Sequence, residues 1–163
     1  MEQGHQQNMS AAMMRKHYMM FGLNVIVGLV IMYLGMFTMI WSTASFFNNL
    51  NMFYMSLIML APMTIVMLAT MGMMMKNRSL NMILYAAFAI VFLLSFWAER
   101  VQGGVGDRQF VRSMIPHHAG AILMCKRASL RDAEVRDLCF KPNGIVESQT
   151  REIAQMNELL NRL

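Results

Sequence analysis

The stretch SMIPHHAGAILMC, residues 113–125, gathers side chains of the kinds that bind soft metal ions. At 100° per residue, five of them share an arc of about 120° on one face of a helix. Thioether and thiolate sulfur favour Cu(I), while imidazole serves copper, zinc and iron. The spacing therefore predicts a metal site for which Cu(I) is the first choice, Ag(I) the second and zinc a poorer one. The five candidate ligands are Met114, His117, His118, Cys125 and, as a peripheral donor, Met124.

The same arc also suits the buried face of a helical hairpin, because Met and Cys are ordinary core residues. For either histidine alone, a structural role and a ligand role are equal alternatives. The pair, with sulfur one turn before it and two turns after it, favours the ligand role. Adjacent residues point about 100° apart on a helix, so one histidine should ligate while the other forms a hydrogen bond or reaches a second metal ion. Pro116 is expected to kink the helix.

A second group of polar and sulfur side chains lies downstream. Gln149, Glu152 and Met156 follow one another at i, i+3 and i+7 and so share a helix face. Met156 is positioned to close the metal site from the opposite helix. Gln149 and Glu152 are candidates for orienting the ligands, although Glu152 can equally be a solvated charge.

The two cysteines allow two interpretations. Cys125 and Cys139 fall on opposite arms of the expected hairpin, in a compartment that permits disulfides. The spacing leaves them about half a turn out of register, so a bridge is not established by spacing. Thiolate ligation by Cys125 is slightly preferred.

A helical hairpin over residues 107–163 must position these side chains. The first helix is expected from 107 to about 128, and the second from 133 to about 160. Asp132 should cap the second helix, Pro142 should break it, and Asn143 should cap its continuation. A hairpin of this size has too little interior to be stable alone, so it should pair with another copy or pack onto the outer ends of the spans. A homo-oligomer is expected, with a dimer favoured.

The rest of the chain is suited to a lipid bilayer. Hydrophobic residues make up 56% of the sequence, and no Asp, Glu, Lys or Arg occurs between Lys16 and Lys76 or between Arg78 and Glu99. These gaps are long enough for membrane-spanning helices. The sequence therefore predicts an all-α membrane protein whose transmembrane domain, residues 19–98, holds three spans at about 19–41, 50–75 and 80–97.

Basic residues predict the orientation of these spans. Arg15 and Lys16 precede the first span, Lys76 and Arg78 lie between the second and third, and the first loop is uncharged. The positive-inside rule places the N-terminal tail, residues 1–18, in the cytoplasm. After the linker at 99–106, the C-terminal hairpin would lie on the periplasmic side of a bacterial inner membrane. The net charge of +5 then reflects topology, and no nucleic-acid partner is expected.

Methionine is unusually frequent, with 22 residues. In the second span, five methionines recur at every fourth position, a spacing that ordinary helix packing accounts for best. The alternative is a ladder of thioethers that passes Cu(I) or Ag(I) through an oligomeric permease. The five are Met55, Met59, Met63, Met67 and Met71.

The segments DRQFVRSMIPHHAGAILM and ESQTREIAQM closely resemble the family catalogued as domain of unknown function 305. The resemblance covers about 57 residues. It implies a ferritin-like helical fold, an extracytoplasmic location and binding of copper or silver through Met and His, without an established catalytic activity. The matching positions are Asp107, Phe110, Met114, Pro116, His117, His118, Ala121, Ile122, Met124, Gln149, Glu152, Ile153 and Met156.

Three functions follow as hypotheses. The first is a membrane-anchored protein that binds Cu(I) or Ag(I) outside the cytoplasm for copper homeostasis, buffering or delivery. The second is the permease with a methionine-lined path, and the third is a structural or assembly module without metal. An enzyme is not expected, because the tail lacks the Glu-x-x-His pairs of ferritin-like di-metal oxidases.

Overall fold

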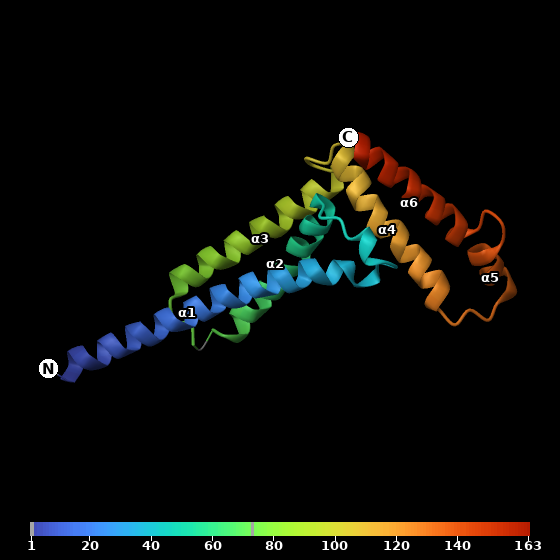
Figure 1. Ribbon diagram of the computed structural model, residues 1–163. Coiled ribbons are helices and arrows are strands. Elements are labelled where there is room, and N and C mark those ends of the chain that lie inside the picture. Colours follow the sequence, from blue (N-terminus) through green and yellow to red (C-terminus); the bar gives the residue numbers. More distant parts are fainter. Residues whose placement is uncertain (1, 73) are drawn as a thin grey trace. The chain divides into compact units, whose positions relative to one another are not determined.

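The structure, a computed structural model, describes residues 2–72 and 74–163, with side chains from residue 12 onward. Its regular elements in these ranges are all helices, as the sequence predicts (Figure 1). The chain divides into two compact units. The first comprises residues 1–33 and 54–101, and the second comprises residues 34–53 and 102–163.

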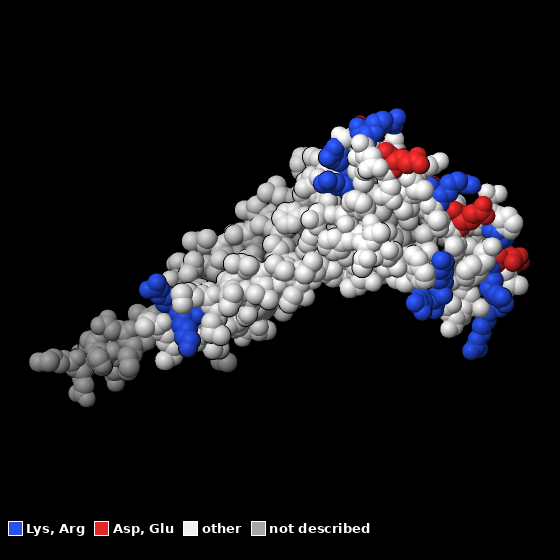
Figure 2. Space-filling view, viewed as in Figure 1, with Lys and Arg blue, Asp and Glu red and all other residues white. Residues whose placement is uncertain are grey.

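Three long apolar helices dominate the first unit: α1 (Glu2–Gly35), α2 (Leu50–Thr70) and α3 (Arg78–Arg100). The segments long and apolar enough to cross a membrane are Ala12–Met39, Leu50–Thr70 and Arg78–Arg100. The chain is therefore suited to membrane association through three helices. Figure 2 shows an uncharged face along these helices, as hydrocarbon contact requires.

Two boundaries differ from the expected ones. Helix α1 begins at Glu2, so no break separates the expected N-terminal tail from the first span. Helix α2 ends at Thr70 rather than near residue 75, because the chain turns at Met71–Gly72. There the backbone amide of Gly72 donates to the carbonyl of Ala69, three residues earlier, which is the spacing of a 3₁₀ turn and not of an α-helix.

A small apolar core and a polar clamp hold the three helices together. Phe21, Leu68 and Met75 are almost fully buried and form one cluster. Beside it, the hydroxyl of Tyr18 donates to Oδ1 of Asn81 at 2.7 Å, and the Asn81 amide donates to the carbonyl of Met75 at 2.7 Å. Few other side chains in the spans are buried, so most of their apolar surface is left for lipid or other helices.

The second unit consists of α4 (Asp107–Arg127), α5 (Ala133–Phe140) and α6 (Ile145–Arg162), together with the connection between α1 and α2. Helix α4 runs without interruption through Pro116. Helices α4 and α6 pack against each other as the two arms of a hairpin (Figure 1). Charged residues of both signs are interspersed over these helices (Figure 2).

The caps of the second arm are partly as expected. The carboxylate of Asp132 accepts from the amide of Val135 at 3.0 Å, which confirms its predicted role as the cap of α5. The prediction that Asn143 caps α6 is wrong, because Gly144 is the N-cap. Asn143 has a φ of 60°, whereas an N-cap needs extended backbone. The Asn143 amide donates instead to Oε2 of Glu147 at 2.9 Å.

The connection between the first two spans belongs to the same unit as the C-terminal helices. It contains two short 3₁₀ turns, η1 (Met36–Met39) and η2 (Thr43–Ser45). The backbone amide of Leu50 donates to Oε1 of Gln109, and the side-chain amide of Asn51 donates to Oγ of Ser113. This connection and α4 therefore lie on the same side of any membrane that the apolar helices cross.

Candidate metal site

His118 occupies the buried interface between α4 and α6. Its Nδ1 lies 2.8 Å from the carbonyl oxygen of Met114, one turn earlier on the same helix. Its Nε2 lies 2.7 Å from Oε2 of Glu152 on α6. Both ring nitrogens of His118 are therefore within hydrogen-bond distance of an oxygen atom, one on its own helix and one on α6.

This arrangement occupies both ring nitrogens of His118 with contacts inside the hairpin. The expectation that one of the two histidines forms hydrogen bonds is met by His118. Its predicted role as a ligand would require both of these hydrogen bonds to be rearranged.

Gln149 and Glu152 belong to the same polar group. The Gln149 amide donates to Oε2 of Glu152 at 3.4 Å, the oxygen that also contacts His118. Glu152 therefore contacts the histidine motif from the opposite helix, and Gln149 contacts Glu152. The side chain of Glu152 is half-exposed.

The contact between His118 and Glu152 also fixes the register of the hairpin. In an antiparallel pair, four residues back on one helix correspond to four residues forward on the other. The register therefore puts Met156 opposite Met114, one turn from the His118–Glu152 contact. Both methionines are half-buried.

His117 differs from its neighbour in its surroundings. It is exposed, and its ring meets that of His118 edge-on with centroids 6.0 Å apart. It lies on the same helix and within one turn of Met114. Met124 is 58% exposed two turns further on, so it lies apart from the other donors, as its peripheral role requires.

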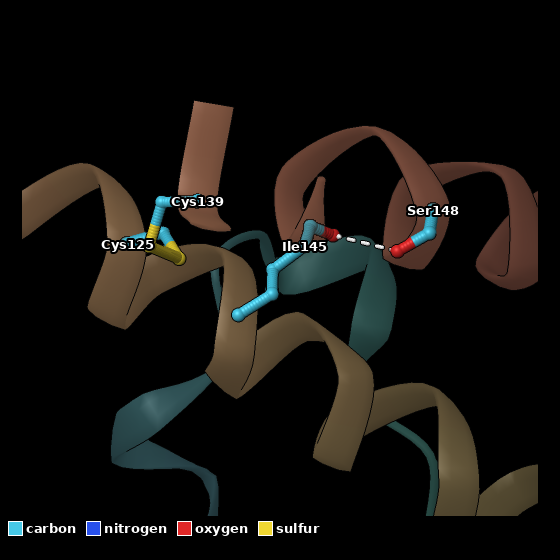
Figure 3. The surroundings of a disulfide bond; sticks show 4 residues. All are labelled: Cys125, Cys139, Ile145 and Ser148. Carbon is cyan, nitrogen blue, oxygen red and sulfur yellow. Dashed lines mark hydrogen bonds between the residues drawn. A yellow bond between two sulfur atoms is a disulfide. The ribbon is translucent and has the colours of Figure 1, made fainter. Parts of the chain in front are cut away.

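Cys125 is joined to Cys139 by a disulfide (Figure 3). The two Cα atoms are 5.6 Å apart, within the usual range for a bridge. The preferred interpretation of Cys125 as a thiolate ligand is therefore wrong for this oxidised chain, since a bridged sulfur is no thiolate. The half-turn mismatch expected from spacing disappears because α5 is a separate short helix. In Figure 3 the side chain of Ile145 extends toward α4 beside the bridge.

The remaining donors are Met114, His117 and Met156: one imidazole and two thioethers. Among the described residues, no three His, Cys, Asp or Glu side chains are grouped as a metal site. That pattern would suit zinc or iron, whereas neutral sulfur with one imidazole suits Cu(I) or Ag(I). The donor set thus fits a soft ion, with fewer ligands than the sequence suggested.

The five methionines of α2 do not share one environment. Met55, Met59 and Met63 are exposed on the single chain, with exposed fractions between 41% and 48%. Met67 and Met71 pack against the cluster of Phe21, Leu68 and Met75. The ladder therefore divides into an outward-facing part and a part that contributes to helix packing.

A contact between the first connection and α4 was not predicted from the sequence. The ammonium of Lys126 lies 4.4 Å from the ring centroid of Trp41, in a cation–π contact. Beside it is a cavity of about 270 Å³. It is lined by Trp41, Ser42, Ala44, Ser45, Ala119, Ile122, Lys126, Thr150, Ile153 and Asn157. The contact could not be predicted because Trp41 and Lys126 are far apart in the sequence.

Comparisons with known proteins extend the resemblance. Residues 61–160 match the family model described as domain of unknown function (DUF305), which reaches from within α2 to within α6. The chain is also 32% identical over 115 residues to an uncharacterised protein of Acanthamoeba polyphaga mimivirus. That alignment covers 69% of this chain and 72% of the relative. No solved structure matches the chain.

Proposed function

The chain belongs to the family described as domain of unknown function 305, and on this premise we propose that it is a membrane-anchored binder of soft metal ions. Cu(I) is the preferred ion, Ag(I) the second and Zn(II) a weaker one. The role is to buffer or deliver copper on the outer face of the membrane. The protein is not an enzyme in this proposal.

One observation carries the proposal. His118 is engaged by Glu152 and by the carbonyl of Met114, while His117 beside it is exposed. The motif thus separates into a histidine that fixes two helices and a histidine that is accessible to an ion. Met114 and the opposing Met156 supply thioethers at the same level of the hairpin. A neutral imidazole with two thioethers matches the preference of Cu(I) for soft donors.

Two further observations support the proposed location of the site. The connection between α1 and α2 lies in one unit with α4, so both are on the same side. Arg15, Lys16, Lys76 and Arg78 flank the opposite ends of the spans. The positive-inside rule then places these basic residues in the cytoplasm and the metal site outside it.

The permease remains the second candidate, and the exposed half of the methionine ladder is what favours it. Met55, Met59 and Met63 face outward from the single chain, where further copies could enclose them. Uptake of Cu(I) into proteoliposomes separates a permease from a binder. Equal Cu(I) uptake by protein-containing and protein-free vesicles is expected here.

The decisive experiment titrates the full chain in detergent with Cu(I) against a competing chelator, with ascorbate as reductant. His117→Ala should weaken Cu(I) binding by more than about tenfold, since even outer hydrogen-bond partners have effects of that size in metal sites. Met82→Leu is the matched control for Met114→Leu and Met156→Leu, because Met82 is an exposed methionine on α3. Wild-type affinity in a folded His117→Ala variant would reject the proposal in favour of the structural module.

A further inference from the structure

An uncharged stripe runs along the exposed side of α4. Its residues are spaced alternately four and three apart, which is the a/d spacing of helices that pair in coiled coils. Phe110 and Met124 at its two ends are 52% and 58% exposed. The stripe consists of Phe110, Met114, His117, Ala121 and Met124.

Helix α6 leaves apolar surface open as well. It has no buried residue, although Met156 and Leu159 on its face toward α4 are half-buried. Leu163, one turn beyond Leu159, is 44% exposed. A hairpin with so little interior is half of a bundle, and a second hairpin would complete it.

The charges at the two ends of α4 indicate which partner and which direction fit. Asp107 begins the helix and Arg127 ends it, each three residues outside the uncharged stripe. An antiparallel copy centred on His117 brings Asp107 opposite the partner's Arg127, whereas a parallel copy would place like charges together. The ammonium of Lys126 lies 4.4 Å from the ring centroid of Trp41, and the guanidinium carbon of Arg127 lies 5.7 Å from it. Arg127 must leave this longer contact to reach the partner's Asp107.

The same register complements the shapes along the stripe. Phe110 meets the partner's Met124, and Met114 lies opposite the partner's Gly120 and next to its Ala121, where the lack of large side chains leaves room for the thioether. The two His117 side chains face each other at the two-fold axis. Each has a Met114 one turn away.

We propose that a second copy of this chain packs antiparallel on this stripe and that one Cu(I) ion is shared between the two His117 imidazoles. The inference rests on the proposed function and completes its donor set. The histidine motif of one chain offers a single imidazole at the surface, because His118 is held by Glu152, and Cys125 adds no thiolate because it is bridged to Cys139. Two copies supply two imidazoles and two Met114 thioethers, all neutral donors suited to Cu(I).

The test uses the full chain in detergent. His117→Cys should be cross-linked to a dimer by a short bis-maleimide, because the position lies on the axis. Gln155→Cys, also exposed but on the outer side of α6, should stay monomeric on the same gel. Cu(I) titration of the wild-type chain should saturate at one ion for every two chains.

A charge reversal provides a second measurement that leaves the donors intact. Asp107→Lys should weaken dimer formation by about tenfold, because it meets the partner's Arg127. Adding Arg127→Glu should restore the dimer, even though both changes oppose the dipole of α4. Failure of the double variant to recover would overturn the antiparallel register.

The outcomes separate this inference from the proposed function. Saturation at one Cu(I) per chain, still dependent on His117, would overturn the shared site and leave the proposed function standing. Cross-linking at position 117 without any Cu(I) binding by the wild-type chain would overturn both metal proposals. Equal cross-linking at positions 117 and 155 would overturn the interface.

Discussion

Nε2 of His118 lies 2.7 Å from Oε2 of Glu152, a residue 34 positions later in the chain. This contact joins the two long helices of the C-terminal unit. It gives His118 a different environment from the adjacent His117. One is fixed in the helix interface and the other is left at the surface. Any account of the motif must treat the two residues separately.

Removing the carboxylate should loosen the hairpin. Glu152→Ala leaves the buried His118 ring without its partner, which we expect to destabilise the packing of α4 on α6 by about 1–2 kcal/mol, given that the carboxylate is half-exposed. Amide hydrogen exchange in residues 112–127 should become faster accordingly. Glu158→Ala, an exposed glutamate on the same helix, is the control. Equal protection in both variants would show that the contact adds nothing to stability.

The disulfide should matter for stability and not for the metal. Replacing both cysteines by serine should lower the free energy of unfolding of the C-terminal unit by about 3 kcal/mol, since the bridge closes a short loop. Cu(I) affinity should stay within about twofold of wild type, because neither sulfur belongs to the proposed donor set. A large loss of Cu(I) affinity in a folded double variant would contradict this prediction and indicate that Cys125 is a ligand.

Gly144 should tolerate no side chain. A Cβ there would lie 2.8 Å from the carbonyl oxygen of Lys141 and 3.0 Å from that of Leu138. These are backbone atoms, so Gly144→Ala should cost about 1–3 kcal/mol and lower the thermal midpoint. Gly106 is the matched control: it is the N-cap of α4, and a Cβ there has nothing within 4 Å. Equal midpoints for the two variants would contradict this packing.

The membrane topology can be tested with single cysteines and a membrane-impermeant maleimide in intact cells, with Cys125 and Cys139 replaced by serine. Cysteines at Thr43 and Arg131 should both be labelled from outside, whereas one at Ser79 should be protected. All three positions are exposed in the structure. If Thr43→Cys were labelled and Arg131→Cys were not, the first connection and the C-terminal helices would not lie on the same side of the membrane. Protection of both with labelling of Ser79→Cys would reverse the proposed orientation alone.

The sequence by itself determined the class of fold and the position of the histidine motif. Long segments without charged residues predict three apolar helices, because a charged side chain in the hydrocarbon core of a membrane is energetically costly and therefore rare there. Asp132 was identifiable as a cap because capping is a local interaction between residues three apart. The motif around His117 was visible for the same reason, since helix periodicity alone brings its members to one face.

Only the tertiary structure decided which of those side chains have partners within the fold and which are exposed. The partner of His118 lies 34 residues away, and that of Cys125 lies 14 residues away across a separate helix. Nor does local sequence reveal that Lys126 meets Trp41 or that the first connection packs on α4. Periodicity assigns a residue to a face, but the identity of the opposing element depends on how distant segments pack. That packing separates His117 from His118.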